Sequence, residues 1–248
     1  MIRALLWDVD GTLAETERDG HRVAFNAAFE AVGVSWRWSE AHYGRLLAVA
    51  GGYERLLHDL KGRDDAPDSA AERAALAARL HRLKNARYAD IVRRGALPLR
   101  AGVAELLADC RRSAVPMAIA TTTSRGNVEA LLEWHLGGDW RGQFAAVVSA
   151  TEAPRKKPDP QVYELALEAL GVAPHEAAAI EDAPAGVEAC RRANVPVVVV
   201  HSHYFPVLAS SQGMCAAGPS LGSGAGWHPA PADPTSRIGL EQIRRWCA

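Results

Sequence analysis

The chain has 248 residues, enough for one large domain or for a core domain with one insertion. Its composition is that of an ordinary globular protein, with 48% hydrophobic, 23% charged and 6% aromatic residues and a formal net charge of -1. This balance excludes a basic surface that would neutralise nucleic-acid phosphates and an acidic disordered tail. Apolar runs such as residues 195–200 are far shorter than the roughly 20 residues that a membrane span needs. We therefore expect neither a nucleic acid nor a membrane as partner.

The N-terminal residues and the cysteines favour a cytoplasmic location. The short apolar run after Met1 meets a charge at Asp8, so it lacks the apolar core and cleavage site of a signal peptide. The cysteines are too far apart for a CxxC redox or zinc pattern, and we expect buried reduced thiols. They are Cys110, Cys190, Cys215 and Cys247. The oligomeric state stays open, with a monomer favoured.

Five short apolar runs predict the strands of a parallel sheet. They lack period-two alternation, which is typical of strands covered by helices on both faces. The runs are residues 4–7, 117–120, 144–148, 177–180 and 195–200. Helical segments at 128–134, 161–170 and 185–193 separate the later runs. This alternation predicts an α/β fold with a doubly wound parallel sheet, similar to a Rossmann core.

The interval between residues 15 and 93 breaks that pattern. Its apolar residues recur at helical spacing, as at Phe25, Phe29 and Val32, and no comparable strand interrupts them. We expect residues 15–93 to form an all-helical insertion, residues 1–14 and 94–248 to form the core, and the two crossings to form a hinge. The stretch 216–234 is rich in Gly, Pro, Ser and Ala, which predicts an irregular surface segment before a last helix at 238–246.

Polar side chains follow the predicted strands. In an open parallel sheet the carboxyl ends of the strands meet at one edge, where ligands bind. Asp8 and Asp10 follow the first strand, and Gly11 permits a turn that brings both carboxylates towards one site. Thr121 to Thr123 follow the second strand and lead into a helix, whose N-terminus suits an anion. A polar turn and ordinary helix capping are the alternatives for these two segments.

The later strand ends carry a basic pair and an acidic pair. Lys156 and Lys157 precede Pro158, which holds the residue before it extended and lets it project a charge. Glu181 and Asp182 follow the fourth strand, and Asp182 with Asp8 would suit a hard cation such as Mg²⁺. The alternatives are solvated surface lysines and capping of the next helix.

Taken together and in this order, the four motifs resemble those of the haloacid dehalogenase-like phosphohydrolases over nearly the whole chain. The helical insertion directly after the first motif looks like the small helical cap shared by phosphoglycolate phosphatases and β-phosphoglucomutases. The segments DVDGTLAETE at 8–17, DGHR at 19–22, AFN at 24–26 and KKPDP at 156–160 resemble the CbbY-type sugar-bisphosphate phosphatases.

The resemblance implies a phosphoric monoester hydrolase with Mg²⁺ as cofactor. Asp8 would attack phosphorus to form an aspartyl-phosphate. Asp10 would protonate the leaving oxygen and then activate water, so its proton affinity should exceed that of Asp8. Mg²⁺ would be held by Asp8, the Asp10 backbone carbonyl and Asp182, with Glu181 in direct contact or one step removed.

The resemblance also assigns the groups that bind the phosphoryl oxygens and the rest of the substrate. Thr121 would donate to a phosphoryl oxygen, and Lys157 would add positive charge and anchor Asp8. Lys156 is expected to be peripheral. The candidates for substrate binding are Glu17, His21, Arg22, Tyr53, Arg55, Thr122 and Thr123. At the position of Tyr53 the CbbY-like pattern has Lys, so a second phosphate would need Arg55 or Arg22 for its charge.

The leading hypothesis is a Mg²⁺-dependent phosphatase of a small phosphorylated sugar, with xylulose or ribulose bisphosphate as candidates. The alternatives are a phosphoglycolate phosphatase and a phosphomutase of the β-phosphoglucomutase kind, although Ser124 and Arg125 replace the Lys and Asn of that enzyme. A haloacid dehalogenase is disfavoured because that branch lacks the second carboxylate, here Asp10. A receiver-like regulatory module is disfavoured because such modules have no cap.

Overall fold

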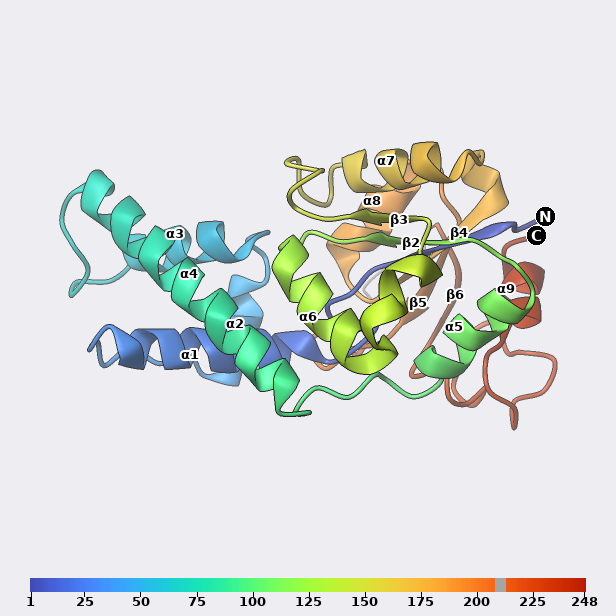
Figure 1. Ribbon diagram of the computed structural model, residues 1–248, viewed down its shortest axis with the longest axis horizontal. Coiled ribbons are helices and arrows are strands. Elements are labelled where there is room, and N and C mark those ends of the chain that lie inside the picture. Colours follow the sequence, from blue (N-terminus) through green and yellow to red (C-terminus); the bar gives the residue numbers. More distant parts are fainter. Residues whose placement is uncertain (208–212) are drawn as a thin grey trace.

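A parallel sheet lies at the centre of the computed structural model, which describes residues 1–207 and 213–248 (Figure 1). The described residues form six strands in the order β3-β2-β1-β4-β5-β6, with every pairing parallel. The strands are β1 (Ala4–Trp7), β2 (Met117–Ala120), β3 (Ala146–Val148), β4 (Ala177–Glu181), β5 (Val197–Val200) and β6 (Met214–Gly218). The chain winds outwards from β1 in both directions, which confirms the predicted doubly wound α/β fold.

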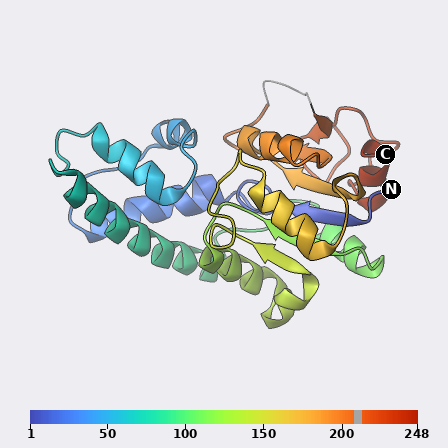
Figure 2. The ribbon, with the colours of Figure 1, turned by 90° about the horizontal axis from the view of Figure 1, so that it is seen from above.

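Both faces of the sheet are buried, because successive side chains of each strand point to opposite sides. In β1, Leu5 and Trp7 join one apolar cluster and Ala4 and Leu6 join the other, and all four are fully buried. One face is covered by α5 (Val103–Arg112), α6 (Arg125–Leu136) and α9 (Leu240–Trp246). The opposite face is covered by α7 (Gln161–Leu170) and α8 (Pro184–Arg192) (Figures 1 and 2). Short 3₁₀ turns, η2 (Gly138–Gln143) and η3 (Pro174–Glu176), complete the core.

The five predicted strands are present, and their bounds shift by two residues at most. The prediction of an irregular segment over 216–234 is wrong at its start, because β6 extends to Gly218. Residues 214–217 are a short apolar run like those of the other strands, but the Gly- and Ala-rich composition that follows outweighs it; the strand pairs with β5. The predicted last helix is present as α9. All four thiols are free, but Cys215 and Cys247 are half-buried, unlike Cys110 and Cys190.

The insertion between β1 and α5 is helical throughout. It contains the π-helical turn η1 (Glu17–His21), then α1 (Arg22–Ala31), α2 (Glu40–Leu46), α3 (Gly52–Lys61) and α4 (Ala70–Arg93). Residues 15–93 are all described and include no strand. They bury an apolar cluster of their own around Phe25, Phe29 and Trp38. We refer to residues 15–93 as the cap, and Figure 2 shows α4 extending from it to lie beside α6 of the core.

The two chain crossings between cap and core lie side by side. Ala14 forms an antiparallel bridge with Leu99, and the backbone N–H of Arg100 donates to the Leu13 carbonyl at 2.8 Å. The segment that enters the cap is therefore hydrogen-bonded to the segment that leaves it, next to the first motif. In the described ranges 1–207 and 213–248, no helix combines the length and apolarity needed to cross a membrane.

Candidate active site

The carboxyl ends of the strands bring the predicted acidic and basic residues together. Asp8 follows β1, and Glu181 with Asp182 closes β4, the neighbouring strand. Lys157 lies on the loop between β3 and α7, and its ammonium group reaches back over the sheet edge. Its Nζ donates to Asp8 Oδ1 at 2.7 Å, to Glu181 Oε1 at 2.6 Å and to the last carbonyl of β2 at 2.8 Å. Residues far apart in sequence thus form one buried ionic cluster.

Burial and charge act in opposite directions on the Lys157–Asp8 pair. Burial raises the pKa of Asp8 to about 7, although the Lys157 ammonium lowers it. Burial also disfavours the charge of Lys157, but Asp8 and Glu181 outweigh it and raise the pKa of Lys157 above its usual value. Lys157 is therefore a fixed cation held against one oxygen of Asp8.

Asp10 lies in a different environment from Asp8. His21 Nε2 lies 3.0 Å from Asp10 Oδ1, and the Thr16 hydroxyl donates to the same oxygen at 2.5 Å. Burial favours the protonated form, but His21 and Thr16 hold the pKa of Asp10 at about 2. The protein's own groups therefore hold the pKa of Asp8 above that of Asp10, whereas the catalytic roles expected from the sequence need the reverse order. The reason is that two donors from the cap entry converge on Asp10, which no local pattern indicates.

The acidic cluster fits a divalent cation. Asp8, Glu181 and Asp182 each offer a carboxylate oxygen, and these oxygens lie within 4.8 Å of one another. Asp182 Oδ1 is buried and has no hydrogen-bond partner among the described residues. Burial and the charge of Asp8 raise the pKa of Asp182 well above its usual value. A buried acceptor without a donor, beside a second carboxylate, is what a hard oxygen-seeking cation such as Mg²⁺ would satisfy.

Glu181 differs from Asp182 because both of its oxygens are occupied. Oε1 accepts from Lys157 and from the Tyr163 hydroxyl, and Oε2 accepts from the Asp182 backbone N–H at 3.1 Å. Gly186 packs so closely that a Cβ there would lie 2.0 Å from this carboxylate. The arrangement favours Glu181 as the residue that orients Lys157, one step removed from a cation.

A polar cavity of about 100 Å³ separates the cap from the core beside Asp10. Thr122 and Thr123 line its core side, together with the N-terminus of α6. Thr121 is buried below them, and its hydroxyl accepts from the Thr123 backbone N–H at 3.2 Å. A larger cavity of about 510 Å³ adjoins Asp8, Asp10, Lys157 and the acidic pair of β4, and α2 and α8 wall it. Asp10 therefore borders both cavities, whereas Asp8 lines the larger one.

The predicted cap residues are placed unequally around these cavities. Glu17 lines both and accepts from the Tyr43 hydroxyl at 2.5 Å. Arg55 also lines both, donates to Tyr43 at 2.7 Å and lies 3.7 Å from Glu17, so its charge is already paired. His21 lies beside Asp10 in the smaller cavity. Arg22 lies 3.5 Å from Glu40 and belongs to the lining of neither cavity.

Tyr53 and Lys156 both line the smaller cavity. Tyr53 comes from α3, and its ring packs edge-on to His81 at a centroid distance of 6.4 Å. Lys156 forms an ion pair with Glu54 of the cap. Lys156 thus lines the smaller cavity and links the core loop to α3, whereas Lys157 contacts Asp8. The orientation of Lys156 depends on the cap, which the local sequence does not indicate.

Sequence reasoning missed Lys84, His81 and Asn127, which complete the smaller cavity. Lys84 is 3% exposed, and its Nζ lies 5.2 Å from the centroid of Phe25 and has Asn85 Oδ1 at 3.4 Å as its hydrogen-bond partner. Burial lowers its pKa to about 8. A signal was available, because Lys84 falls four residues after the buried Leu80 on the apolar face of α4.

Comparison with known proteins places the chain in a family. Residues 2–194 match the model of the haloacid dehalogenase-like hydrolases. The CbbY protein of Cupriavidus necator is 42% identical over 245 residues, covering 99% of this chain and 93% of that protein. The CbbY protein of Cereibacter sphaeroides is 40% identical over 82% of this chain and 86% of its own length.

Two solved structures superpose on this chain over almost its whole length. CbbY from Rhodobacter sphaeroides in complex with phosphate superposes with a TM-score of 0.85 at 35% identity, covering 98% of this chain and 100% of that one. A mutant of that protein in complex with xylulose-(1,5)bisphosphate gives a TM-score of 0.84 at 34% identity, covering 98% and 99%. This chain belongs to the haloacid dehalogenase-like hydrolases, in their CbbY-type branch.

Proposed function

We propose that this CbbY-type phosphatase removes one phosphate from a small sugar bisphosphate, through a phosphoaspartate on Asp8 and with Mg²⁺ as cofactor. The observation that carries the proposal is the polar cavity between Asp10 and Lys84. Lys84 is a desolvated ammonium group in the lining of this cavity, and it gains a hydrogen-bonded anionic partner when a phosphate dianion enters. The bisphosphate bound in the similar structure from Rhodobacter sphaeroides supports the same substrate class. Lys84 would then supply the charge that Tyr53 cannot.

The first step is a transfer of the phosphoryl group to Asp8. Lys157 holds Asp8 Oδ1, and the other oxygen attacks phosphorus while the bond from phosphorus to the sugar oxygen breaks. Asp10 gives its proton to that leaving oxygen. It can hold a proton at that stage because a phosphate dianion beside it raises its pKa by like-charge repulsion. Thr121 and the backbone N–H groups before α6 would donate to the phosphoryl oxygens.

In the second step Asp10 accepts a proton from water, whose oxygen attacks phosphorus and breaks the bond to Asp8. Inorganic phosphate leaves and Asp8 is regenerated. When bound by Asp8, Asp182 and the Asp10 carbonyl, Mg²⁺ would supply positive charge that offsets the repulsion between the Asp8 carboxylate and the phosphate. Glu181 and Tyr163 keep Lys157 in place throughout. The paired Arg55 and Glu17 would face the sugar hydroxyls from the cap.

A panel of phosphate esters tests the proposal. Xylulose 1,5-bisphosphate, ribulose 1,5-bisphosphate, glucose 1-phosphate and phosphoglycolate are assayed for released phosphate with Mg²⁺ and with EDTA. We expect the highest kcat/KM for a bisphosphate, loss of activity with EDTA and none in Asp8→Asn. Isomerisation of glucose 1-phosphate without net phosphate release would identify a mutase and overturn the proposal, and turnover by Asp8→Asn would remove Asp8 as nucleophile.

A further inference from the structure

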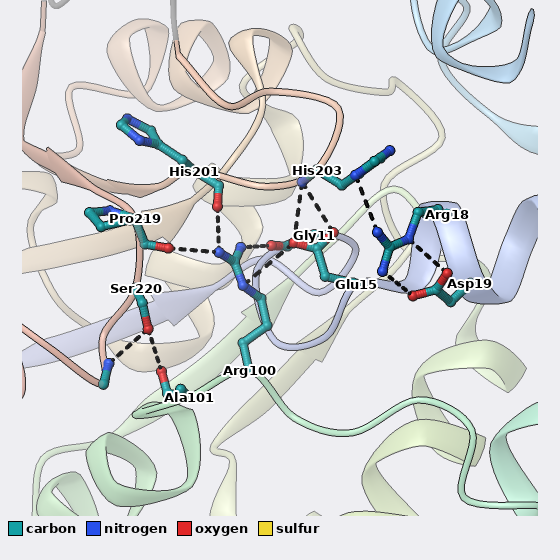
Figure 3. A network of polar contacts seen from close by, with 11 residues as sticks. Gly11, Glu15, Arg18, Asp19, Arg100, Ala101, His201, His203, Pro219 and Ser220 are labelled. Carbon is teal, nitrogen blue, oxygen red and sulfur yellow. Dashed lines mark hydrogen bonds and ion pairs between the residues drawn. The ribbon is translucent and has the colours of Figure 1, made fainter. Parts of the chain in front are cut away.

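Arg100 joins four separate segments of the chain beside the loop that follows β1 (Figure 3). It lies on the return crossing from the cap, and its guanidinium donates to the carbonyls of Gly11 and His201. It also donates to the Pro219 carbonyl at 3.1 Å and lies 3.8 Å from the Glu15 carboxylate. The side chain is 13% exposed, so these contacts are largely shielded from water. One planar group thus connects the first motif, the cap entry and the ends of β5 and β6.

Two of these contacts flank Asp182. Gly11 has a φ of +86°, and a Cβ on it would lie 2.1 Å from Asp182 Oδ2, so its backbone forms a wall of the carboxylate's site. His201 immediately precedes Ser202, a buried residue whose hydroxyl lies beside Asp182. Arg100 therefore holds the peptides on both sides of the carboxylate whose Oδ1 has no partner among the described residues.

We propose that Arg100 is a positioning residue for the cation site, which fixes the Gly11 and His201 peptides so that Asp182 is presented to a divalent cation. The inference rests on the proposed metal site. A guanidinium can donate to several carbonyls in fixed directions, whereas an ammonium cannot replace that fork. Arg100→Lys keeps the charge and loses the fork, so this variant separates the effect of geometry from that of charge.

Direct binding of Mn²⁺ to the substrate-free full chain tests the inference, by calorimetry and by the electron paramagnetic resonance of free Mn²⁺. The variants are Arg100→Lys, which keeps the charge and loses the fork, and Arg100→Met, which loses both. Arg237→Met is the matched control, because Arg237 ties the C-terminal segment to Asp109 with two hydrogen bonds of 2.7 and 2.8 Å away from the acidic cluster. Asp182→Asn removes the proposed ligand itself.

We expect both Arg100 variants to raise the Kd for Mn²⁺ about tenfold, the usual effect of losing a residue that orients metal ligands. The Kd of Arg237→Met should stay within twofold of the wild-type value. A rise of less than fivefold in Arg100→Lys, or tighter binding by Arg100→Met, overturns the inference. Circular dichroism and thermal melts check folding, and Arg100→Lys alone suffices if Arg100→Met does not fold. If Asp182→Asn binds Mn²⁺ as the wild type does, the proposed metal site itself fails, which is a different result.

Discussion

Removing the ammonium group of Lys84 should make the protein more stable and a poorer enzyme. Lys84 is 3% exposed, and its neighbours are the faces of Phe25 and Tyr88 and the amide of Asn85. Lowering its pKa from 10.5 to about 8 corresponds to about 3 kcal/mol of free energy against the charged form. Lys84→Met removes this cost and keeps the length and apolar contacts of the side chain.

The sign of the stability effect depends on pH. Below pH 8 Lys84 is protonated in both the folded and the unfolded chain, so the whole cost is present. Between pH 8 and pH 10.5 the unfolded chain keeps a proton that the folded chain has lost, and wild-type stability rises with pH through this window. At pH 7 we therefore expect Lys84→Met to raise the free energy of unfolding by up to about 3 kcal/mol.

A phosphate dianion bound at Lys84 would relieve the same cost. Lys84→Met should therefore lower kcat/KM for a sugar bisphosphate by about a hundredfold, the kinetic equivalent of about 3 kcal/mol. For a monophosphate the loss should be small. Urea denaturation followed by tryptophan fluorescence measures stability, and phosphate release measures kcat/KM, with the exposed Lys61→Met as matched control. Equal losses on both substrates, or no gain in stability, would refute the reasoning.

Three further outcomes follow from the site. The kcat/KM of the wild type for a bisphosphate should fall above about pH 8 as Lys84 loses its proton, and Lys84→Arg should remove that fall. If the fall persists in Lys84→Arg, another group than Lys84 causes it. Gly11→Ala should abolish both phosphate release and Mn²⁺ binding, because its Cβ would lie 2.1 Å from a carboxylate oxygen of Asp182. The control Gly33→Ala has a similar φ of +80° but open space around the Cβ, and it should keep both activities. Mn²⁺ binding by Gly11→Ala would contradict this steric argument. Tyr163→Phe removes a hydrogen-bond donor to Glu181. We expect kcat to drop about tenfold with an unchanged KM, and the free energy of unfolding to fall by about 1 kcal/mol. A change in KM alone would count against Tyr163 as a residue that holds Lys157 in place.

Local patterns were sufficient for much of the fold. The apolar runs of β1 and β2 need burial on both faces wherever they lie, so their bounds were predicted correctly from residue type alone. The helical spacing of Phe25 and Phe29 likewise indicated the insertion. Asp8, Lys157 and Asp182 could be expected to meet because parallel strands bring their carboxyl ends to one edge. Strand β6 escaped prediction because its short apolar run, residues 214–217, overlaps the start of the Gly-, Pro-, Ser- and Ala-rich stretch.

The chemical state of the site was decided by tertiary contacts. Nothing near Asp10 in sequence shows that His21 and Thr16 donate to one of its oxygens, so its low pKa could not be predicted. The lowered pKa of Lys84 likewise results from its burial, which only the packing of the folded chain produces. Arg100 connects segments that are about a hundred residues apart along the chain. Residue type and periodicity specify which groups are present and which strand ends they follow, whereas pKa and orientation depend on neighbours within a few ångströms, which the folded chain alone brings together.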